Sequence, residues 1–264
     1  PANYCKSHSP RFFTKMQATG NDFIILNYLE NKLEYSYKLL AEFMCNRHFG
    51  IGADGILIVE KSNKADFKMR IFNKDGSEAE MCGNGIRCVA KYVYDYGLTD
   101  KTNISVDTKS GIKYLDLTVT NGKVALVKVN MGQPELNAEK IPMIYKKQQV
   151  IQQPLAVKDN IYEVTAVSMG NPHVIVYMDQ IRDLAIEKIG PDFEKHPAFP
   201  EGVNTEFVHV IDRKTVEMRV WERGSGETLA CGTGACAVAV ACVLNGYTEE
   251  EVTIRLLGGE LKIF

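Results

Sequence analysis

The sequence lacks a long hydrophobic run and any marked excess of charge of one sign. Its longest apolar stretch, residues 235–244, is shorter than the roughly 20 residues that a membrane-spanning helix needs. The net charge is −2, and lysines and arginines are scattered, which argues against a nucleic-acid or membrane-surface protein. Residues 1–10 lack the apolar core of a signal peptide. We therefore expect a cytoplasmic protein that binds neither nucleic acid nor membrane.

Recognisable metal and disulfide patterns are also missing. No Cys-x-x-Cys pair occurs, and the five histidines show no ligand spacing, so no metal site is expected. The seven cysteines are an odd number, which argues against a secreted disulfide framework. Cys88, Cys236 and Cys242 lie in apolar helical runs and are expected to be small buried side chains, whereas Cys5 falls in the N-terminal segment.

Four landmarks recur in the same order in the two halves of the chain, which indicates an internal duplication. The segment 69–73 (MRIFN) returns as 218–222 (MRVWE), 149 residues later. The other pairs are Gly20-Asn21 with Gly170-Asn171, Gly76-Ser77 with Gly224-Ser225, and Asp54 with Asn204. This period exceeds the roughly 20–50 residues of solenoid repeats. We therefore expect two facing domains, residues 1–128 and 129–264, with a linker over 130–160.

Each half carries a cysteine at the start of a glycine-rich turn followed by an apolar run. The turns are Cys82-Gly83-Asn84-Gly85 and Cys231-Gly232-Thr233-Gly234. Each thiol is thus predicted to lie at a helix N-terminus, which favours anions and lowers the pKa of a thiol. We expect both N-termini to point at the domain boundary.

The rest of the sequence alternates short strands with few helices. Asn121-Gly122 favours a type I′ hairpin turn. The helix after Cys82 should end near Gly97, and the helix after Cys231 is apolar on all sides and so should be buried. The predicted fold class is α+β, with two pseudo-symmetric strand-rich domains, each a mixed sheet wrapped around a central helix. Predicted strands cover 24–28, 56–60, 67–73, 115–120, 123–129, 164–167, 174–178, 206–211, 215–221, 252–257 and 260–264.

Two thiols at paired helix N-termini suit the transfer of a proton from one face of a carbon to the other. Removing the α-proton of an amino acid needs either pyridoxal phosphate as an electron sink or a preorganised site with a base and an acid. The chain contains no phosphate-binding loop of a known pattern. Inversion requires acid and base of one kind, because their roles swap with direction. Cys82 and Cys231 meet that requirement as thiolate and thiol.

The residues around both cysteines resemble the active-site segments of diaminopimelate epimerase. The resemblance covers the chain from about Phe13 onward, and its strongest matches are 81–88 and 223–234, supported by 20–23, 47–54, 169–173 and 203–204. It implies a diaminopimelate epimerase-like fold with the active site in the cleft between two domains and with no cofactor or metal. It also implies interconversion of LL- and meso-diaminopimelate in lysine and peptidoglycan precursor synthesis. Gly55 stands where some family members carry a glutamine that contacts substrate.

The resemblance also assigns roles to individual residues. Cys82 and Cys231 match the catalytic acid/base residues, and His173 and Glu222 match the residues that tune the cysteine pKa values. Arg223 suits a second carboxylate of the substrate and Glu222 a second ammonium group. Substrate-binding positions are Asn21, Asn73, Gly83, Asn84, Asn171, Asn204, Glu222, Arg223, Gly232 and Thr233.

Two other functions use the same two thiols. A proline or hydroxyproline racemase of the same fold would hold one compact ring and would not need Glu222 and Arg223. A noncatalytic redox sensor would instead join Cys82 and Cys231 in a reversible disulfide. A related isomerase branch lacks both cysteines. The small-molecule substrate is the expected partner, and the sequence leaves open whether the chain forms a homodimer.

Overall fold

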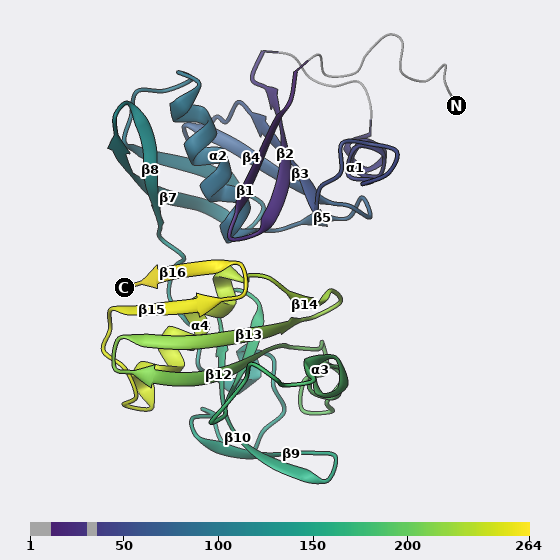
Figure 1. The fold of residues 1–264 in the computed structure, drawn as a ribbon, viewed down its shortest axis with the longest axis vertical. Helices are drawn as coiled ribbons and strands as arrows, with labels where there is room; N and C mark the ends of the chain where they lie inside the picture. Colours follow the sequence, from purple (N-terminus) through teal and green to yellow (C-terminus); the bar gives the residue numbers. More distant parts are fainter. Residues whose placement is uncertain (1–11, 31–35) are drawn as a thin grey trace. The chain divides into compact units, whose positions relative to one another are not determined.

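A computed structural model describes residues 12–30 and 36–264. Their contacts divide them into two compact units, one ending at Asn130 and the other comprising Met131–Phe264 (Figure 1). Each unit has an eight-stranded sheet. Cys5 and the N-terminal segment 1–10 lie outside the described residues. Within the described ranges, no helix is long and apolar enough to cross a membrane.

The first unit is a mixed sheet of order β1-β2-β3-β4-β6-β7-β8, with β5 on β4. The pairs β2–β3 and β4–β6 are parallel, and the other pairs are antiparallel. Its elements are β1 (Thr14–Ala18), β2 (Asn21–Tyr28), α1 (Tyr37–Met44), β3 (Gly55–Glu60), β4 (Phe67–Asn73), β5 (Glu78–Ala79), α2 (Gly83–Asp95), β6 (Asn103–Thr108), β7 (Gly111–Thr120) and β8 (Lys123–Val129).

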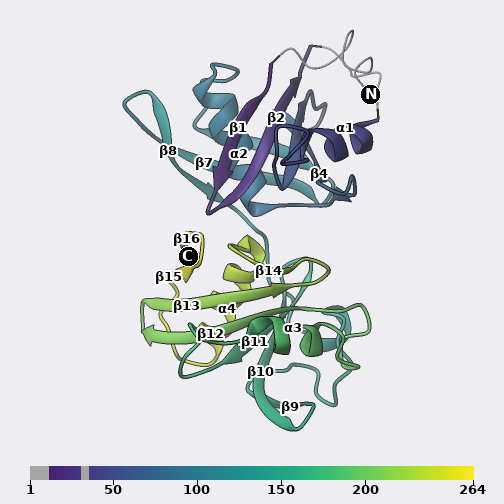
Figure 2. The same ribbon diagram turned by 45° about the vertical axis from the view of Figure 1, so that its right-hand side comes forward.

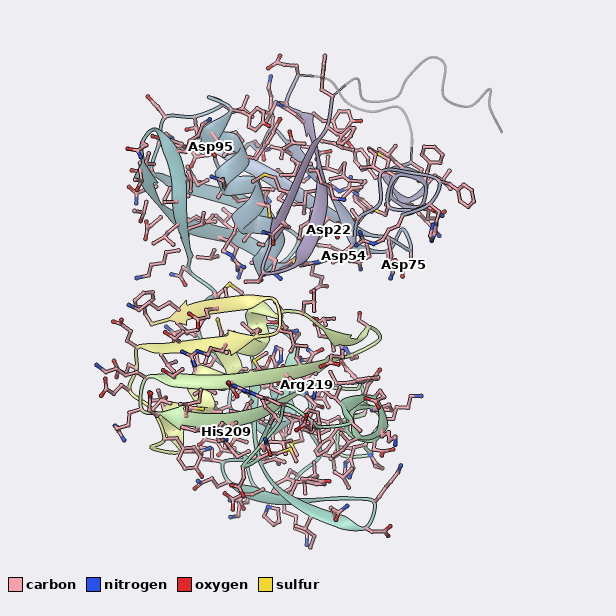
Figure 3. The ribbon with its side chains drawn as sticks, in the orientation of Figure 1. Asp22, Asp54, Asp75, Asp95, His209 and Arg219 are labelled. Carbon is pink, nitrogen blue, oxygen red and sulfur yellow. The ribbon has the colours of Figure 1, made fainter. Side chains whose placement is uncertain are left out.

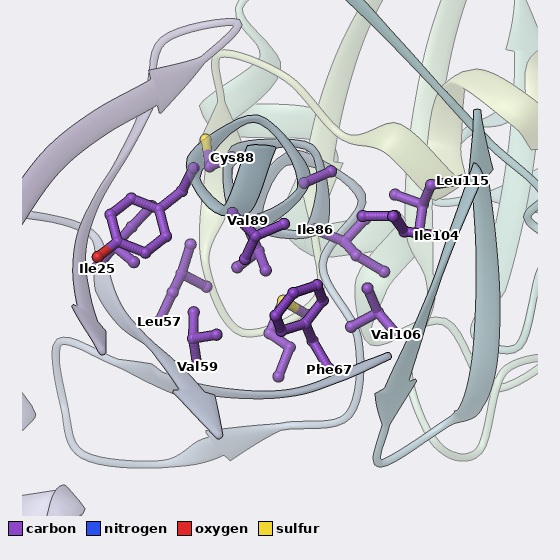
Figure 4. Close-up of a cluster of buried hydrophobic side chains, with 14 of the residues drawn as sticks. Ile25, Leu57, Val59, Phe67, Ile86, Cys88, Val89, Ile104, Val106 and Leu115 are labelled. Carbon is purple, nitrogen blue, oxygen red and sulfur yellow. The ribbon is translucent and has the colours of Figure 1, made fainter. Parts of the chain in front are cut away.

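Helix α2 is the centre of the first unit. It packs against β1 on one side and β8 on the other, an arrangement visible in Figures 1 and 2. Ile86, Val89 and Val93 point from α2 into the core and are fully buried, with Ile86 and Val89 lying over Leu57 and Phe67 in Figure 4. The helix ends as its sequence predicts, because Gly97 adopts a positive φ of 71° that a side chain would oppose.

The second unit repeats this plan, with the order β16-β15-β13-β12-β11-β10-β9 and β14 on β13. Its parallel pairs are β11–β12 and β13–β15. Its elements are η1 (Ala138–Lys140), β9 (Gln153–Val157), β10 (Asn160–Ser168), β11 (Pro172–Tyr177), α3 (Ile186–Glu194), β12 (Asn204–Asp212), β13 (Thr215–Glu222), β14 (Gly226–Thr228), α4 (Gly232–Leu244), β15 (Val252–Leu256) and β16 (Gly259–Ile263).

Helix α4 is the counterpart of α2, and the predicted fold class is confirmed. The helix packs against β10, β11, β12, β15 and β16, so its all-round apolar surface is covered by strands. Ala235, Val238 and Ala241 are fully buried. Val243 and Leu244 in its last turn are exposed, which limits the predicted burial to the first three turns. Cys88 and Cys242 are buried as expected, whereas Cys236 is half-buried.

Several sequence expectations need correction. Residues 130–160 are not a linker, because Ile141, Met143 and Val150 are buried in the core of the second unit and β9 begins at Gln153. The segment is therefore part of the second unit, and its last proline, Pro154, lies in β9. Helices α1 and α3 and strands β1, β6 and β9 lay outside the predicted elements.

The correspondence of Asp54 with Asn204 is off by one residue. In the parallel pairs, Phe23 lies opposite Gly55 and His173 opposite Asn204. Because Phe23 and His173 each stand two residues after the repeated asparagine, the counterpart of Asn204 is Gly55.

Candidate active site: two cysteine-capped helices

Each cysteine is the N-cap of the central helix of its unit. Cys82 and Cys231 have extended backbones, with φ/ψ of −143°/116° and −125°/115°. The Cys82 Sγ accepts the N–H of Gly85 at 3.4 Å, and the Cys231 Sγ accepts that of Gly234 at 3.3 Å. A capping side chain normally carries oxygen. Here the sulfur occupies that place, so both thiols face the positive end of a helix dipole.

The capped glycines pack closely against side chains of the strands beneath them. A Cβ on Gly85 would lie 2.9 Å from the Cδ2 of Leu57, and a Cβ on Gly234 would lie 2.6 Å from the Oε1 of Glu206. Glycine therefore lets each first helical turn approach the strand beneath it without displacing a neighbouring side chain.

In the first unit, Asn21 and Asn84 surround Cys82. The Sγ of Cys82 lies 3.7 Å from the Oδ1 of Asn21, and the Nδ2 of Asn84 donates to the same oxygen at 3.4 Å. Arg87 Nη2 donates to Asn84 Oδ1 at 2.6 Å, so a guanidinium one helical turn away orients the Asn84 amide. Gly83 is the first residue of α2 and is buried.

The Asn21 side chain is held by an ion-pair network at the start of β2 and β3. Its Nδ2 donates to Asp54 Oδ2 at 2.8 Å. Arg47 joins Asp22 and Asp54, with Nη2 distances of 2.7 and 3.0 Å, and Figure 3 shows the two aspartates side by side. Burial raises the pKa of Asp22, but hydrogen bonds and charges from Arg47 and Lys15 outweigh it and hold that pKa well below its usual value.

Asn73 is at the end of β4, opposite Gly55. Its exposed side chain donates from Nδ2 to the Ser77 hydroxyl at 3.0 Å. Among the hydrogen bonds found for residues 12–30 and 36–264, none joins the Asn73 side chain to Asn21, Cys82 or Asn84.

In the second unit, a chain of polar side chains leads to Cys231. Thr233 Oγ1 lies 3.4 Å from the Cys231 Sγ, and Asn171 Nδ2 donates to that hydroxyl at 3.3 Å. The Oδ1 of Asn171 lies 3.0 Å from His173 Nε2. The His173 Nδ1 in turn lies 2.7 Å from the Oε1 of Glu206, and both side chains are fully buried. The Glu206 Oε2 is buried and has no hydrogen-bond partner among the described residues.

Glu222 and Asn204 lie at the turn that precedes the Cys231 segment. The Thr228 hydroxyl donates to Glu222 Oε1. Burial, reinforced by the nearby Glu206 charge, raises the pKa of Glu222. Asn204 Oδ1 accepts the backbone N–H of Arg223 at 2.9 Å.

Arg223 and Gly232 complete the predicted set. The exposed guanidinium of Arg223 donates to the carbonyl of Glu201 at 2.8 Å, so the side chain has a defined direction. Gly232 is the first residue of α4. The second unit thus brings Asn171, His173 and Thr233 together around Cys231, while Asn204 and Arg223 are joined to each other.

The expectation that the helix N-terminus lowers the thiol pKa does not hold for Cys231. Burial raises the pKa of Cys231 well above its usual value, and the charges of Glu222 and Glu206 add to the effect. The Thr233 hydroxyl and the Gly234 N–H act in the opposite direction but do not outweigh burial. Cys231 therefore rests as a thiol, the form that donates a proton.

Glu206 is the site residue that sequence reasoning missed. It lies within the predicted strand 206–211, and a glutamate beside Phe207 and Val208 is a departure from the pattern of a buried strand. Comparison of the two halves could have found it, because its counterpart in the first unit is Leu57. Within the described residues, no group of histidine, cysteine, aspartate or glutamate could hold a metal ion.

Comparison with known proteins gives a consistent picture. The family profile described as "Diaminopimelate epimerase" matches residues 13–137 and 165–264. A diaminopimelate epimerase of Methanococcus maripaludis (strain C5) is 56% identical over 251 residues, which cover 95% of this chain and 90% of that protein. A diaminopimelate epimerase of Acetivibrio thermocellus is 55% identical over 251 residues, with 95% and 89% covered.

Solved structures share the fold at lower identity. A hydroxyproline epimerase from Agrobacterium vitis superimposes with a TM-score of 0.69 at 14% identity, covering 95% of this chain and 82% of that one. The resemblance at this identity concerns the fold alone.

Proposed function

Because the chain belongs to the diaminopimelate epimerase family, we propose that its two N-capping cysteines interconvert LL- and meso-diaminopimelate. The chain is an isomerase. The observation that carries the assignment of Cys82 and Cys231 is their matched position, since each sulfur caps the central helix of its unit. Cysteine thiolates are effective bases once formed, and the helix N-terminus stabilises the charge that they acquire.

The proposed reaction is a two-base proton transfer. One cysteine, as thiolate, takes the α-proton, and the C–H electron pair is left on the α-carbon and its carboxylate. The other cysteine, as thiol, gives its proton to the opposite face, and the configuration inverts. The first sulfur ends as thiol and the second as thiolate, so the roles swap with the direction of reaction. Because burial raises the pKa of Cys231, we propose that Cys231 starts as the thiol that gives its proton.

The N-termini of α2 and α4 supply the donors that the carbanion needs. Backbone N–H groups at Gly83 and Asn84, and at Gly232 and Thr233, are proposed to bind the reacting carboxylate. Such preorganised donors stabilise the negative charge that builds up in the transition state. His173 and Glu222 are proposed to tune the cysteine pKa values, and Arg223 and Glu222 to bind the distal carboxylate and ammonium. The remaining proposed substrate contacts are Asn21, Asn73, Asn171 and Asn204.

Proton NMR in D2O tests the proposal. The reduced protein is incubated with LL-diaminopimelate, and L-proline is supplied in a parallel tube. Loss of the α-proton signal together with appearance of the meso isomer is the expected result. Exchange in the proline tube alone would reassign the chain to the proline or hydroxyproline racemases, whose fold it shares. Exchange in neither tube would contradict catalysis and favour the redox sensor.

We propose further that the reaction needs neither pyridoxal phosphate nor a metal ion, and that the enzyme works in the cytoplasm without nucleic acid as partner. Dialysis against a chelator should leave the rate of α-proton exchange unchanged. Carbonyl reagents such as hydroxylamine should also leave it unchanged, because they inactivate enzymes that carry an aldehyde cofactor. Light scattering decides whether the chain forms the homodimer that the sequence leaves open.

A further inference from the structure

The two units differ in what lies beneath the cysteine turn. In the first unit, the strands β2 and β3 place Phe23 and Leu57 there, both in the apolar core around α2. The same positions of β11 and β12 carry His173 and Glu206. These equivalent positions are apolar in the first unit and polar and ionisable in the second. This difference indicates that they have a role in the second unit that they lack in the first.

Both ring nitrogens of His173 meet oxygen atoms. Nδ1 faces a carboxylate oxygen of Glu206 at 2.7 Å, and Nε2 faces the amide oxygen of Asn171 at 3.0 Å. Carboxylate and amide oxygens only accept hydrogen bonds, so both nitrogens must donate, which requires the imidazolium form. The Glu206 carboxylate balances that charge. An isolated imidazolium would not persist at a site with no solvent exposure.

This arrangement fixes the direction of the hydrogen bonds up to the thiol. Because Asn171 presents its Oδ1 to His173, its Nδ2 points to the Thr233 hydroxyl oxygen at 3.3 Å. The hydroxyl proton of Thr233 is then directed to the Cys231 sulfur at 3.4 Å. A hydrogen bond donated to sulfur stabilises the thiolate more than the thiol.

We propose that Glu206 is a positioning residue that keeps His173 doubly protonated and thereby directs the Thr233 hydroxyl proton onto the Cys231 sulfur. This inference rests on the proposed function for its catalytic meaning, since it explains how the buried thiol ionises during turnover. Its structural content does not depend on the substrate.

The charged groups that face Cys231 determine in which direction a change at Glu206 shifts the pH midpoint of Cys231 ionisation. Glu206 and Glu222 both oppose ionisation of the thiol, His173 carries the compensating positive charge, and the N-terminus of α4 adds its dipole. In wild type the positive His173 and the negative Glu206 cancel. In Glu206→Gln the carboxylate charge is gone, and we expect His173 to give up its second proton, so the two side chains again carry no net charge.

Glu206→Gln should reverse the hydrogen bonds. Neutral His173 keeps Nδ1–H toward the introduced amide and exposes a lone pair on Nε2. Asn171 then turns its NH2 to that lone pair and its oxygen to Thr233, which donates to Asn171 and no longer to Cys231. The pH midpoint of Cys231 ionisation should therefore rise by about one unit, the loss of one hydrogen bond to a charged group.

Alkylation by iodoacetamide at a series of pH values, followed by mass spectrometry of the Cys231 peptide, measures that midpoint. Cys82 in the same sample is an internal control, because it belongs to the first unit and Glu206 to the second, and its midpoint should not move. Glu217→Gln is the matched variant, since Glu217 lies on the adjacent strand β13 and pairs with Arg182. It should leave both midpoints unchanged.

Thr233→Val provides the second test. It should raise the Cys231 midpoint by itself, and adding Glu206→Gln should raise it no further, because the two changes remove one hydrogen bond. An additive shift, an unchanged midpoint in Glu206→Gln, or a fall would overturn the proposal. A fall would mean that Glu206 acts only as a negative charge.

If Glu206→Gln does not fold, the wild-type protein alone can still show whether His173 is doubly protonated. Nitrogen-15 NMR of labelled histidine reports the protonation of each ring nitrogen of His173, with His173→Gln identifying its signals. Both nitrogens should be protonated near neutral pH, and an unprotonated Nε2 would contradict the inference. None of these readouts uses diaminopimelate, so failure of the proposed function would appear separately in the D2O experiment.

Discussion

Gly190 packs directly against the indole ring of Trp221, because a Cβ on Gly190 would lie 2.4 Å from the Cγ and Cδ2 of Trp221. The same helix, α3, ends in Glu194, whose carboxylate accepts the Trp221 indole N–H at 2.7 Å and the Gly224 N–H at 3.0 Å. Helix α3 therefore holds both sides of the turn that carries Glu222 and Arg223.

Gly190→Ala should displace Trp221 and loosen this turn. Alanine is the better helix former by about 1 kcal/mol, but overpacking against the ring costs about 1–3 kcal/mol. We expect a net loss of stability and a higher KM for diaminopimelate. Trp221 is the only tryptophan of the chain, so its fluorescence reports the displacement directly.

Lys188→Ala is the control for helix propensity, since Lys188 is exposed on the same helix. It should change neither the fluorescence nor the KM. An unchanged emission spectrum in Gly190→Ala would show that the backbone absorbs the added methyl group.

Gly85→Ala and Gly234→Ala should differ although the two glycines are equivalent. The methyl group at 85 would meet the end of the flexible Leu57 side chain, which can give way. The methyl group at 234 would press on Glu206 Oε1 and lie 3.2 Å from the Cys231 sulfur. We expect Gly234→Ala to lower both Tm and kcat more strongly than Gly85→Ala, as measured by calorimetry and the epimerase assay. Equal losses would mean that the buried ion pair tolerates displacement.

Cys82→Ser and Cys231→Ser should each reduce epimerisation by about 10²–10⁴-fold, the usual contribution of a positioned acid or base. Serine is too weak an acid to form the base at neutral pH. Cys88→Ala and Cys242→Ala, in the same two helices, should stay within about twofold once the folded fraction is equal. Wild-type rates in either serine variant would rule out the two-thiol mechanism.

Stability should fall at alkaline pH because of Cys231. Its pKa is raised in the folded state, so unfolding releases a proton once the pH exceeds the ordinary thiol value of about 9. Stability from this group is thus complete below pH 9 and declines as the pH rises toward the folded pKa, by up to about 1.4 kcal/mol per unit. Cys231→Ala should reduce the slope of unfolding free energy against pH by that amount, measured with denaturant and reductant present. Parallel curves for wild type and variant would contradict the raised pKa.

Much of the fold followed from local sequence patterns. The period-2 alternation in 67–73 and the Asn121-Gly122 turn placed β4 and the β7–β8 hairpin correctly, because both signals are carried by adjacent residues. Helix α3 was not predicted, because it contains Gly190 and Pro191, and these residue types ordinarily argue against a helix. Packing on Trp221 explains the glycine, and that contact cannot be read from neighbours in sequence.

In the candidate site, too, the local features could be predicted from the sequence and the long-range effects could not. The turns at Cys82 and Cys231 stood out because they repeat, and both became helix N-caps. The thiol pKa of Cys231 could not be predicted from its cap alone, since burial and two glutamates outweigh the helix N-terminus. These long-range effects depend on which strands lie beneath the helix. The one-residue error in matching Asn204 has the same origin, because strand pairing is also long-range.

The raised pKa of Cys231 gives the proposed mechanism a kinetic asymmetry. Inversion in one direction leaves Cys231 as thiolate, the form that the free enzyme disfavours, whereas inversion in the other direction restores the resting state. Under the proposed mechanism, each turnover leaves the two sulfurs with exchanged protonation states, so they must exchange protons with solvent before the same direction of reaction can repeat. At high substrate concentration, this proton exchange would be slower in the direction that starts from the Cys231 thiolate, because the free enzyme must then return to its disfavoured form.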